Sequence, residues 1–253
     1  MKYTFGDTKT ADDRLLRIAT FFNPKAHDFI CNHLEKEINC AIDLGCGPGH
    51  TTNMLQLATS AKKVIGLDIS GNFVDAAKSY YPNLTFRVHD ITQGGFPEKA
   101  DCMYSRFLLS HLTDINAVLN LWIKELNNDG MLFIDELEEI QTNYEIFKEY
   151  LEISTELVSS QGASLFIGKQ LENEAQSLNV VFNESIILPV ENKTAAWWFY
   201  PNTVSVWKTD TYIKNMLSET EREYISNKLL EISETEDNIS NITWKMKRLI
   251  IKK

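Results

Sequence analysis

The sequence of 253 residues contains little cysteine and no long apolar run. Its four cysteines show no CxxC spacing, and a chain of this length needs no disulfides to fold, so we expect reduced thiols. No stretch of about 18 apolar residues is present that would span a membrane, and the N-terminus lacks the apolar core of a secretion signal. These absences predict a cytoplasmic protein without a membrane span.

Basic side chains are also in the minority, with 25 Lys and Arg against 35 Asp and Glu and a formal charge of -10. A surface with this excess of acid repels a polyphosphate backbone and lacks the counterion release that drives most nucleic-acid binding. An excess of acid also serves solubility alone. We therefore expect no nucleic-acid partner and a small-molecule substrate.

Short apolar runs alternate with segments of helical periodicity along the chain. The predicted strands are residues 40–44, 63–67, 84–88, 102–105, 131–137, 180–188 and 242–251. The predicted helices are residues 11–22, a second segment from Pro24 to residue 37, then 50–58, 73–80, 111–126, 144–158, 169–178 and most of 195–234. Strands and helices alternating at this spacing form right-handed βαβ units around a parallel sheet.

No repeat or low-complexity tract divides the chain, so we predict one domain over residues 1–253. Residues 1–38 are predicted as an N-terminal helical cap, and residues 190–240 as a helical, aromatic-rich insertion before the last strand. The insertion contains Trp197, Trp198, Phe199 and Tyr200. This cluster fits the wall of a substrate pocket, the insertion's own small core, or the contact of a homodimer.

A glycine-rich loop, Asp43-Leu44-Gly45-Cys46-Gly47-Pro48-Gly49, lies between the first of these strands and a helix. Such glycines let the backbone approach a ligand that the helix N–H groups face. A dinucleotide fingerprint needs a third glycine at position 50, where the chain has His50, and the Asp43 carboxylate would repel a pyrophosphate. The same carboxylate suits the amino group of S-adenosylmethionine. The loop therefore favours this cofactor over NAD.

Two further acids follow the next two strands. Asp68 ends the second strand, where a carboxylate accepts hydrogen bonds from both ribose hydroxyls of a bound nucleoside. Asp90 follows the third strand, in position for the exocyclic amine of adenine, with Ile91 packing on the ring. Asp90 fits equally well as a turn or N-cap aspartate.

Five segments resemble the class I S-adenosylmethionine-dependent methyltransferases: DLGCGPG, VIGLDIS, FRVHDI, MYSRFLLSHLTD and ELNNDGMLFIDE. The segments SRFLLSHL and NNDG, together with YTFGD, Arg14 and FIGKQL, resemble the small-molecule branch that includes ubiquinone and menaquinone C-methyltransferase-like proteins. The resemblance implies an α/β fold: a Rossmann-like, doubly wound, seven-stranded and mostly parallel sheet with its last strand antiparallel. It also implies N-terminal helices that close over the cofactor.

The resemblance further implies a role for each matched residue. The methionine part would be surrounded by Asp43, Gly45, Gly47 and Gly49, the ribose held by Asp68, the adenine by Ile69 and Asp90, and the cofactor's inner face by Ser105 and Arg106. Methyl transfer from a sulfonium is an in-line displacement on an activated carbon, so the enzyme mainly aligns the reactants and excludes water. Few catalytic side chains are needed.

Candidates for catalysis are correspondingly few. His111 could face the substrate as a general base, although a polar residue near a helix start is the simpler interpretation. Tyr3 and Phe5, with Arg14, could reach over the pocket, although an N-terminal aromatic usually serves packing.

An acidic run, Asp135, Glu136, Glu138 and Glu139, invites comparison with a metal site. No histidine is close in sequence, so we predict a solvated strand end and no metal.

Two other functions stay open. An NAD-dependent oxidoreductase also has a glycine-rich turn after its first strand, and a non-catalytic binding module could keep the nucleotide fold. The chain lacks the Asn-Pro-Pro-Tyr segment of adenine methyltransferases and the Pro-Cys dipeptide of cytosine-C5 enzymes. The function favoured by the sequence is therefore methyl transfer to a small molecule.

Overall fold

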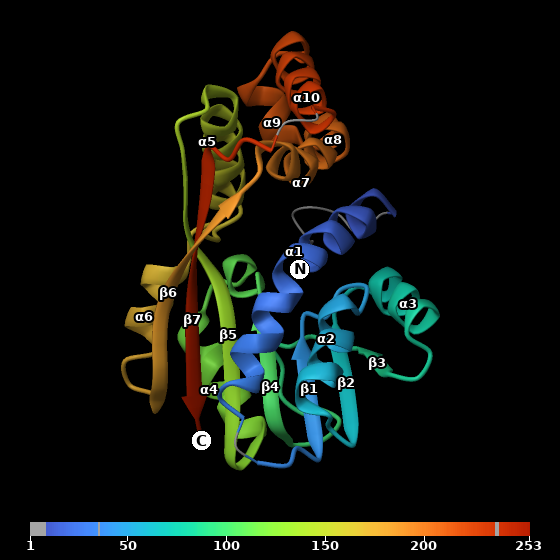
Figure 1. Ribbon diagram of the computed structural model, residues 1–253, viewed down its shortest axis with the longest axis vertical. Coiled ribbons are helices and arrows are strands. Elements are labelled where there is room, and N and C mark those ends of the chain that lie inside the picture. Colours follow the sequence, from blue (N-terminus) through green and yellow to red (C-terminus); the bar gives the residue numbers. More distant parts are fainter. Residues whose placement is uncertain (1–8, 35, 236–237) are drawn as a thin grey trace.

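The computed structural model describes residues 9–34, 36–235 and 238–253. Within these ranges seven strands form one sheet of order β3-β2-β1-β4-β5-β7-β6 (Figure 1). The strands are β1 (Cys40–Leu44), β2 (Lys63–Asp68), β3 (Thr85–Val88), β4 (Ala100–Arg106), β5 (Leu126–Thr142), β6 (Val180–Val190) and β7 (Ile242–Lys252). The strands from β3 to β5 pair in parallel, whereas β7 runs antiparallel to both β5 and β6. The predicted mostly parallel sheet with an antiparallel last strand is confirmed.

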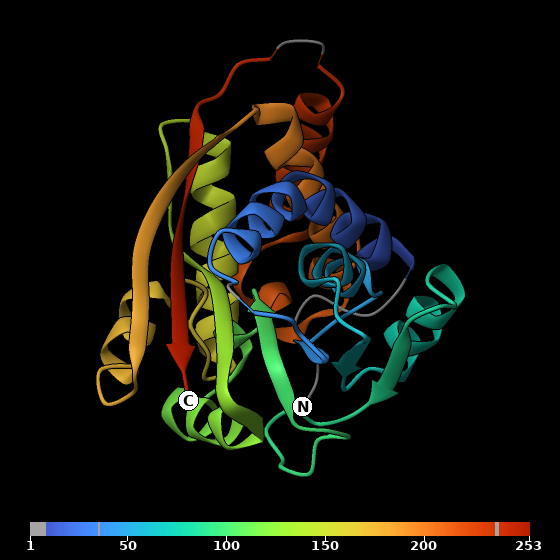
Figure 2. The ribbon, with the colours of Figure 1, turned by 60° about the horizontal axis from the view of Figure 1, so that its bottom comes forward.

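Helices cover both faces of the sheet (Figures 1 and 2). They are α1 (Lys9–Cys31), α2 (His50–Thr59), α3 (Gly71–Tyr80), α4 (Ile115–Glu125), α5 (Glu145–Ser160), α6 (Gly168–Glu174), α7 (Asn192–Val204), α8 (Val206–Thr209), α9 (Thr211–Met216) and α10 (Glu219–Ser233). In the described part of the chain no helix combines the length and hydrophobicity of a membrane-spanning segment.

The central strands are buried on both faces, which explains their continuous apolar runs. In β4, Met103 belongs to the core beneath α4 and α6, and its neighbours Cys102 and Tyr104 belong to the core beneath α1 and α2. Successive side chains of a strand point to opposite faces, so a strand covered on both sides shows no polar alternation. This burial made the strands recognisable in the sequence.

The predicted pair of N-terminal helices is wrong, because α1 continues through Pro24 as one helix. A proline inside a helix removes a backbone hydrogen bond and costs about 3 kcal/mol. In α1 this cost is offset by burial on both sides of the proline, where Phe22, Ala26 and Phe29 are 3% exposed or less. Tertiary packing therefore outweighs the local break.

The predicted helix over residues 111–126 is divided in two. A short 3-10 helix, η1 (Leu109–His111), comes first, and α4 begins only after Asp114, whose side chain accepts a hydrogen bond from Ala117 N at 3.0 Å. Asp114 is therefore an N-cap that starts a new helix. Residues 127–130, which lie between the predicted helix and the predicted strand 131–137, are included in β5, where the pairing with β4 shifts register between Ala100 and Cys102.

Strands β5, β6 and β7 extend past the rest of the sheet, and helices α5 and α7 to α10 gather around their ends (Figure 1). These elements share a second core that contains Phe147, Trp198, Trp207 and Trp244. Phe22 of α1 joins the same core. Helix α1 therefore lies between the sheet and the helices of the insertion, above the carboxyl ends of the parallel strands.

Candidate functional site

The candidate site lies where the strand order reverses between β1 and β4. In this register Leu44 of β1 lies beside Ser105 of β4, and the glycine loop and Arg106 follow directly. Loops leave two such strands in opposite directions and open a crevice at their carboxyl ends, where open α/β sheets bind ligands. The structure thus brings the predicted loop and the predicted β4 residues together.

Three glycines of the loop adopt the left-handed conformation, with φ of +65° at Gly45, +50° at Gly47 and +87° at Gly49. A Cβ atom at Gly45 would lie 2.7 Å from Leu108 Cδ1. At Gly47 the only described atom near a Cβ would be Leu15 Cδ1, at 3.7 Å. Gly47 is therefore the position where a ligand can approach the backbone of the loop closely.

Asp43 is buried beneath this loop with 1% of its surface exposed. Its Oδ2 accepts hydrogen bonds from the hydroxyls of Thr51 and Thr52 at 2.6 and 2.7 Å. Burial raises the pKa of Asp43 to about 6, and the two hydroxyls and the charge of Arg106 oppose that rise. Neither threonine was predicted from the sequence as part of the site. A Thr-Thr pair in the first helical turn after a glycine loop nevertheless indicates side chains that face the loop.

Asp68 binds the loop directly. Its Oδ2 accepts a hydrogen bond from Gly47 N, and its Oδ1 accepts one from Ser70 N, both at 2.8 Å. Oδ1 of Asp90 accepts hydrogen bonds from the backbone and hydroxyl of Thr92 at 3.0 and 2.7 Å. The Thr92 hydroxyl is the main reason that the pKa of Asp90 is lowered. Asp90 therefore forms a turn, and its contact with adenine stays a prediction.

The two isoleucines assigned to adenine differ in exposure. Ile69 is 43% exposed beside Asp68, which suits packing against a ligand ring. Ile91 is 5% exposed, belongs to the main core, and its carbonyl accepts a hydrogen bond from Trp122 Nε1 at 2.9 Å. Ile69 is thus the better placed of the two.

Ser105 and Arg106 present buried polar atoms to the crevice. Ser105 Oγ and Arg106 Nη1 have no hydrogen-bond partner among the residues that the structure describes. Arg106 Nη2 donates to Asn23 Oδ1 at 2.8 Å, and Asn23 Nδ2 donates to the carbonyl of His50 at 3.0 Å. Buried polar atoms without partners are uncommon, so these atoms indicate room for a polar ligand. Asn23 was not predicted from the sequence as a site residue, and its hydrogen bonds connect α1 to Arg106 and His50.

Helix α1 covers the loop. Asp12 accepts a hydrogen bond from the Tyr80 hydroxyl at 2.5 Å, and its other oxygen lies 3.5 Å from His50 Nε2. Leu15, three residues further along, lies over Gly47. The structure therefore places α1 where the resemblance puts a cofactor lid. Tyr3 and Phe5 lie outside the described residues.

A small cavity of about 110 Å³ adjoins the crevice. Its walls are mainly aromatic and aliphatic and include Phe107, Trp198, Phe199 and Trp244, with Arg14 and His111 among the polar exceptions. Of the aromatic cluster of the insertion, Trp197 instead lies against Arg17, whose Cζ is 4.1 Å from the ring centroid, and Tyr200 packs on the second core. The cluster is therefore divided between the cavity wall and the packing of the insertion.

His111 lines this cavity from η1. Burial, together with the positive charge of Arg14, lowers its pKa to about 4. The imidazole is therefore neutral at pH 7 and is a weak base. This argues against the predicted role of His111 as a general base.

Glu136 supports the turn that leads from β4 into the cavity. Its Oε1 accepts hydrogen bonds from the N–H groups of Leu108 and Leu109 at 2.7 and 2.9 Å. The preceding residue, Phe107, has a φ of 52°, which is strained for a side chain of its size. Burial raises the pKa of Glu136 to about 8. At pH 7 the Glu136 carboxyl is thus mostly neutral, and its hydrogen bonds stabilise the strained turn at Phe107 beside the site.

The prediction that the acidic run is a solvated strand end is wrong. Asp135, Glu136 and Glu138 are at most 8% exposed and only Glu139 of the run is exposed, because β5 continues through the whole run paired with β7, although its pairing with β4 ends at Asp135. Asp135 lies 3.5 Å from Arg248 Nε, and Glu138 lies 2.7 Å from Lys245 Nζ. In the described ranges no group of three side chains is arranged to bind a metal ion.

Removing the Glu136 carboxyl is expected to destabilise the fold. In Glu136→Ala two buried N–H groups lose their acceptor, which should lower the free energy of unfolding by about 2–4 kcal/mol. Glu136→Gln keeps an acceptor and should remain within about 1 kcal/mol of the original chain. Urea denaturation at pH 7 measures both. Equal losses in the two variants would contradict this role.

The pH dependence of stability provides a second readout of Glu136. Its pKa is raised from 4.5 to about 8, so the folded chain binds more protons than the unfolded chain between these values. The contribution of Glu136 to stability is therefore lost as the pH rises through this window. Glu136→Gln should flatten that decline.

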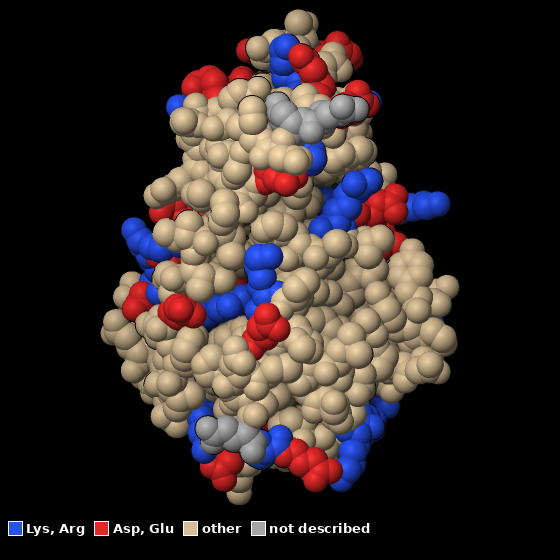
Figure 3. All heavy atoms as spheres, viewed as in Figure 1, with Lys and Arg blue, Asp and Glu red and all other residues tan. Residues whose placement is uncertain are grey.

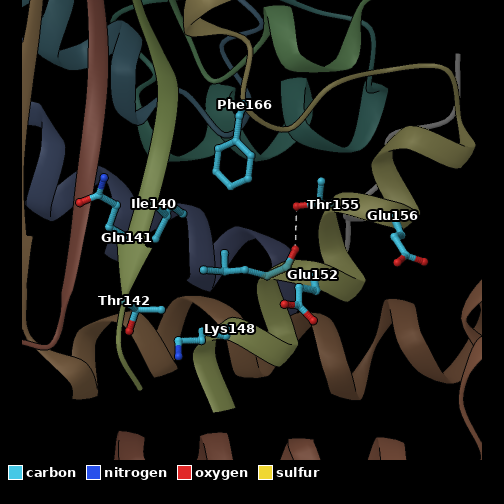
Figure 4. Close-up of a pocket in the computed structure, with 9 residues that line it drawn as sticks. Ile140, Gln141, Thr142, Lys148, Glu152, Thr155, Glu156 and Phe166 are labelled. Atoms are coloured by element: carbon cyan, nitrogen blue, oxygen red, sulfur yellow. Dashed lines mark hydrogen bonds between the residues drawn. The ribbon is translucent and has the colours of Figure 1, made fainter. Parts of the chain in front are cut away.

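A larger and more open hollow of about 510 Å³ lies between β5 and α5. Figure 4 shows Ile140 and Thr142 on the strand side, Glu152 and Thr155 on the helix side, and Phe166 across from them. It shares Ile140 and Leu151 with the small cavity, so the two spaces are neighbours. No residue of the glycine loop lines it, and we therefore place the candidate site at the crevice.

Comparison with known proteins agrees with this site. Residues 41–130 match a family described as a methyltransferase domain. Trans-aconitate 2-methyltransferase of Agrobacterium fabrum is 29% identical over 108 residues, which cover 43% of this chain and 42% of that protein. The chain thus matches less than half the length of this relative. The matched region contains the glycine loop, Asp68, Asp90 and Arg106.

Solved structures show the same fold over most of the chain. A phosphoethanolamine N-methyltransferase of Haemonchus contortus superposes with a TM-score of 0.56 at 15% identity, covering 91% of this chain and 52% of that one. A cyclopropane synthase of Mycobacterium tuberculosis gives a TM-score of 0.56 at 15% identity, with 91% and 84% covered. The predicted Rossmann-like fold is thus confirmed, and residues 41–130 are similar to a methyltransferase domain.

Proposed function

We propose that the chain is an S-adenosylmethionine-dependent methyltransferase that acts on a small molecule. The observation that carries this proposal is the space at Gly47, where a Cβ atom would make only an ordinary contact of 3.7 Å with Leu15 Cδ1, beside the buried Asp43 carboxylate and between the ends of β1 and β4. An anion beneath a loop with open backbone suits a ligand with a positively charged amino acid end. The phosphoethanolamine N-methyltransferase above was solved with S-adenosylhomocysteine, which supports this choice of cofactor.

The residues present fit this cofactor. Asp43, Gly45, Gly47 and Gly49 would hold its methionine part, and Asp68 its ribose. Ile69 and Asp90 would hold the adenine, with Ile91 beneath them, while the buried atoms of Ser105 and Arg106 would meet its inner face. The bound cofactor supplies a methyl group on a positively charged sulfur.

The chain's own contribution is alignment and exclusion of water. Helix α1 closes the crevice from above through Leu15 and the contacts of Asp12, and Trp198 and Trp244 wall the adjoining cavity. A dry, preshaped site brings a nucleophile into line with an electrophile and strengthens the electrostatic interactions inside it.

Calorimetric titration separates the proposal from its two alternatives. We expect S-adenosylmethionine and S-adenosylhomocysteine to bind and NAD not to bind, because His50 occupies the position of the third fingerprint glycine. Binding of NAD alone would refute the methyltransferase. Cofactor binding without methyl transfer to any acceptor would favour a non-catalytic module.

The variant Asp68→Ala tests the assignment of the ribose. We expect it to weaken S-adenosylhomocysteine binding about 10- to 100-fold, since a carboxylate that accepts two hydroxyls and supports Gly47 N is lost. Asp75→Ala, on the exposed side of α3, is the matched control and should leave the affinity unchanged. Calorimetry measures the affinity of both variants for S-adenosylhomocysteine. An unaltered affinity in Asp68→Ala would contradict the assignment of Asp68 to the ribose.

The proposal keeps the wider expectations of the sequence: a cytoplasmic protein, a possible homodimer, no nucleic-acid partner, and membership of the branch with ubiquinone and menaquinone C-methyltransferases. On the face drawn in Figure 3, acidic and basic side chains are interspersed, which offers no extended basic surface for a phosphate backbone. Reduced cysteines support the location, since all four are free thiols. Gel filtration would test the oligomeric state.

A further inference from the structure

The cavity beside the crevice is rich in hydrogen-bond donors. Trp198 and Trp244 line it with 2% and 7% of their surface exposed. Within the described residues neither indole Nε1 has a hydrogen-bond partner. An indole N–H is a donor only, and a buried donor without an acceptor is costly. A ligand in this cavity would therefore lower its free energy by supplying acceptors.

The charge of the cavity has one sign. Arg14, which is 7% exposed, lines it, whereas no Asp or Glu is among its described lining residues. Burial lowers the pKa of His111 and raises the pKa of Tyr150, and the charge of Arg14 favours a lower pKa at both groups, so it acts across the cavity. The Tyr150 hydroxyl accepts a hydrogen bond from Asn202 Nδ2 at 2.7 Å and interacts with the Ser154 hydroxyl, so neutral polar groups line the cavity beside Arg14. A negatively charged acceptor complements such a site.

We propose that the methyl acceptor is a small carboxylic acid, held by its carboxylate near Arg14 and by its apolar body against Trp198, Phe199 and Trp244. This inference rests on the proposed methyltransferase function. A carboxylate oxygen attacks the methyl carbon, the bond from that carbon to sulfur breaks, and a methyl ester and S-adenosylhomocysteine result. The negative charge of the acid and the positive charge of the sulfonium cancel, and no proton moves.

Other acceptor classes fit the cavity less well. An amine binds largely as a cation, which Arg14 repels and no lining carboxylate attracts. A phenol must lose its proton to a base, and His111, with a pKa lowered to about 4 by burial, is a weak one. A carboxylate is already ionised at neutral pH and needs no base.

The size of the cavity selects the probes. Its volume of about 110 Å³ is smaller than the cavity of about 150 Å³ that binds benzene, so the acid should have a short aliphatic body. Suitable probes are butyrate, crotonate and hexanoate, each paired with its neutral amide. Each pair has nearly the same shape and differs in charge.

Calorimetric titration of these pairs into the protein saturated with S-adenosylhomocysteine tests the inference. We expect at least one acid to bind at least tenfold more tightly than its amide. Equal affinities in every pair, or no binding of any acid, would overturn the inference. Failure of S-adenosylhomocysteine itself to bind would instead overturn the proposed function, so the two failures are distinguishable.

Conservative variants locate the acid. Trp198→Phe keeps an aromatic side chain but removes the indole N–H, and should weaken acid binding about 3- to 10-fold while the affinity for S-adenosylhomocysteine stays unchanged. Trp197→Phe, outside the cavity, is the matched control and should change neither. Identical acid affinities in Trp198→Phe and Trp197→Phe would contradict the proposed contact.

The variant Arg14→Gln tests which carboxylate Arg14 binds: that of the acceptor, or that of the cofactor's methionine part. Loss of the preference for acid over amide, with cofactor affinity intact, supports the inference. If the variant instead binds S-adenosylhomocysteine more weakly and keeps its preference for the acid over the amide, Arg14 contacts the cofactor, and its role in acceptor binding is overturned.

The product provides an independent test. Incubation with methyl-labelled S-adenosylmethionine and the bound acid should yield a labelled product that alkali hydrolyses to methanol, as a methyl ester does. An alkali-stable product from an amine, a phenol or the ring carbon of a quinol, formed in preference, would overturn the inference.

Discussion

The variant Gly47→Ala is expected to bind S-adenosylhomocysteine about 100-fold more weakly than the original chain, a loss of roughly 3 kcal/mol. The added methyl group would occupy the space that lies open beside the loop, where the nearest described side-chain atom is 3.7 Å away. The fold should tolerate it, because the strain of a φ of +50° in alanine costs only about 1–2 kcal/mol. Binding is thus expected to suffer more than stability.

The control for Gly47→Ala is Gly95→Ala. Gly95 has a φ of +80° and no described atom within 4 Å of a Cβ, so the variant carries a similar backbone strain away from the crevice. Calorimetry and thermal denaturation should show two comparable losses of stability and a loss of affinity in Gly47→Ala alone. Equal affinities in the two variants would mean that the ligand does not approach the loop at Gly47.

The affinity for the cofactor is expected to fall below about pH 6, by up to tenfold for each pH unit. The pKa of Asp43 in the free protein is raised to about 6 by burial, and a bound ammonium favours the ionised carboxylate and so lowers that pKa. Binding below pH 6 must therefore release a proton, and the affinity increases with pH until Asp43 is ionised. Above that pH the affinity should be constant.

The neighbours of Asp43 determine how large this effect is. The hydroxyls of Thr51 and Thr52 on α2 and the charge of Arg106 on β4 favour the carboxylate, whereas the charge of Asp68 on β2 opposes it. Asp43→Asn removes the titrating group and keeps a side chain that can bond to both threonines. It should lower the affinity about 100-fold at pH 7.5 and abolish the slope. A slope that persists in this variant would assign the titration to another group.

The three glycines of the loop could be recognised from the sequence, because their conformation follows from backbone geometry. Only glycine adopts a φ between +50° and +87° without strain, and three glycines stand where the loop requires it. The central strands were equally recognisable, since strands buried on both faces read as short apolar runs. The locations of the loop, Asp43 and Asp68 were thus predictable from local sequence.

Long-range packing reversed several local signals. Pro24 predicted a helix boundary, but α1 continues across it because Phe22 packs against Phe107 and Phe29 packs against Phe133. The acids of β5 predicted a solvated strand end, but β7 pairs beside them and supplies Arg248 and Lys245. In both cases the deciding partner lies far away in the sequence.

The sequence by itself determined the central strands, the glycine loop and the acids at the strand ends, because each depends on residues close together in the chain. Only the tertiary structure decided what the cavity contains. Arg14, His111, Trp198 and Trp244 come from four separate elements and meet where α1, η1, α7 and β7 pack together. The charge of a cavity and the arrangement of its hydrogen-bond donors arise from such packing, and local sequence patterns do not predict them.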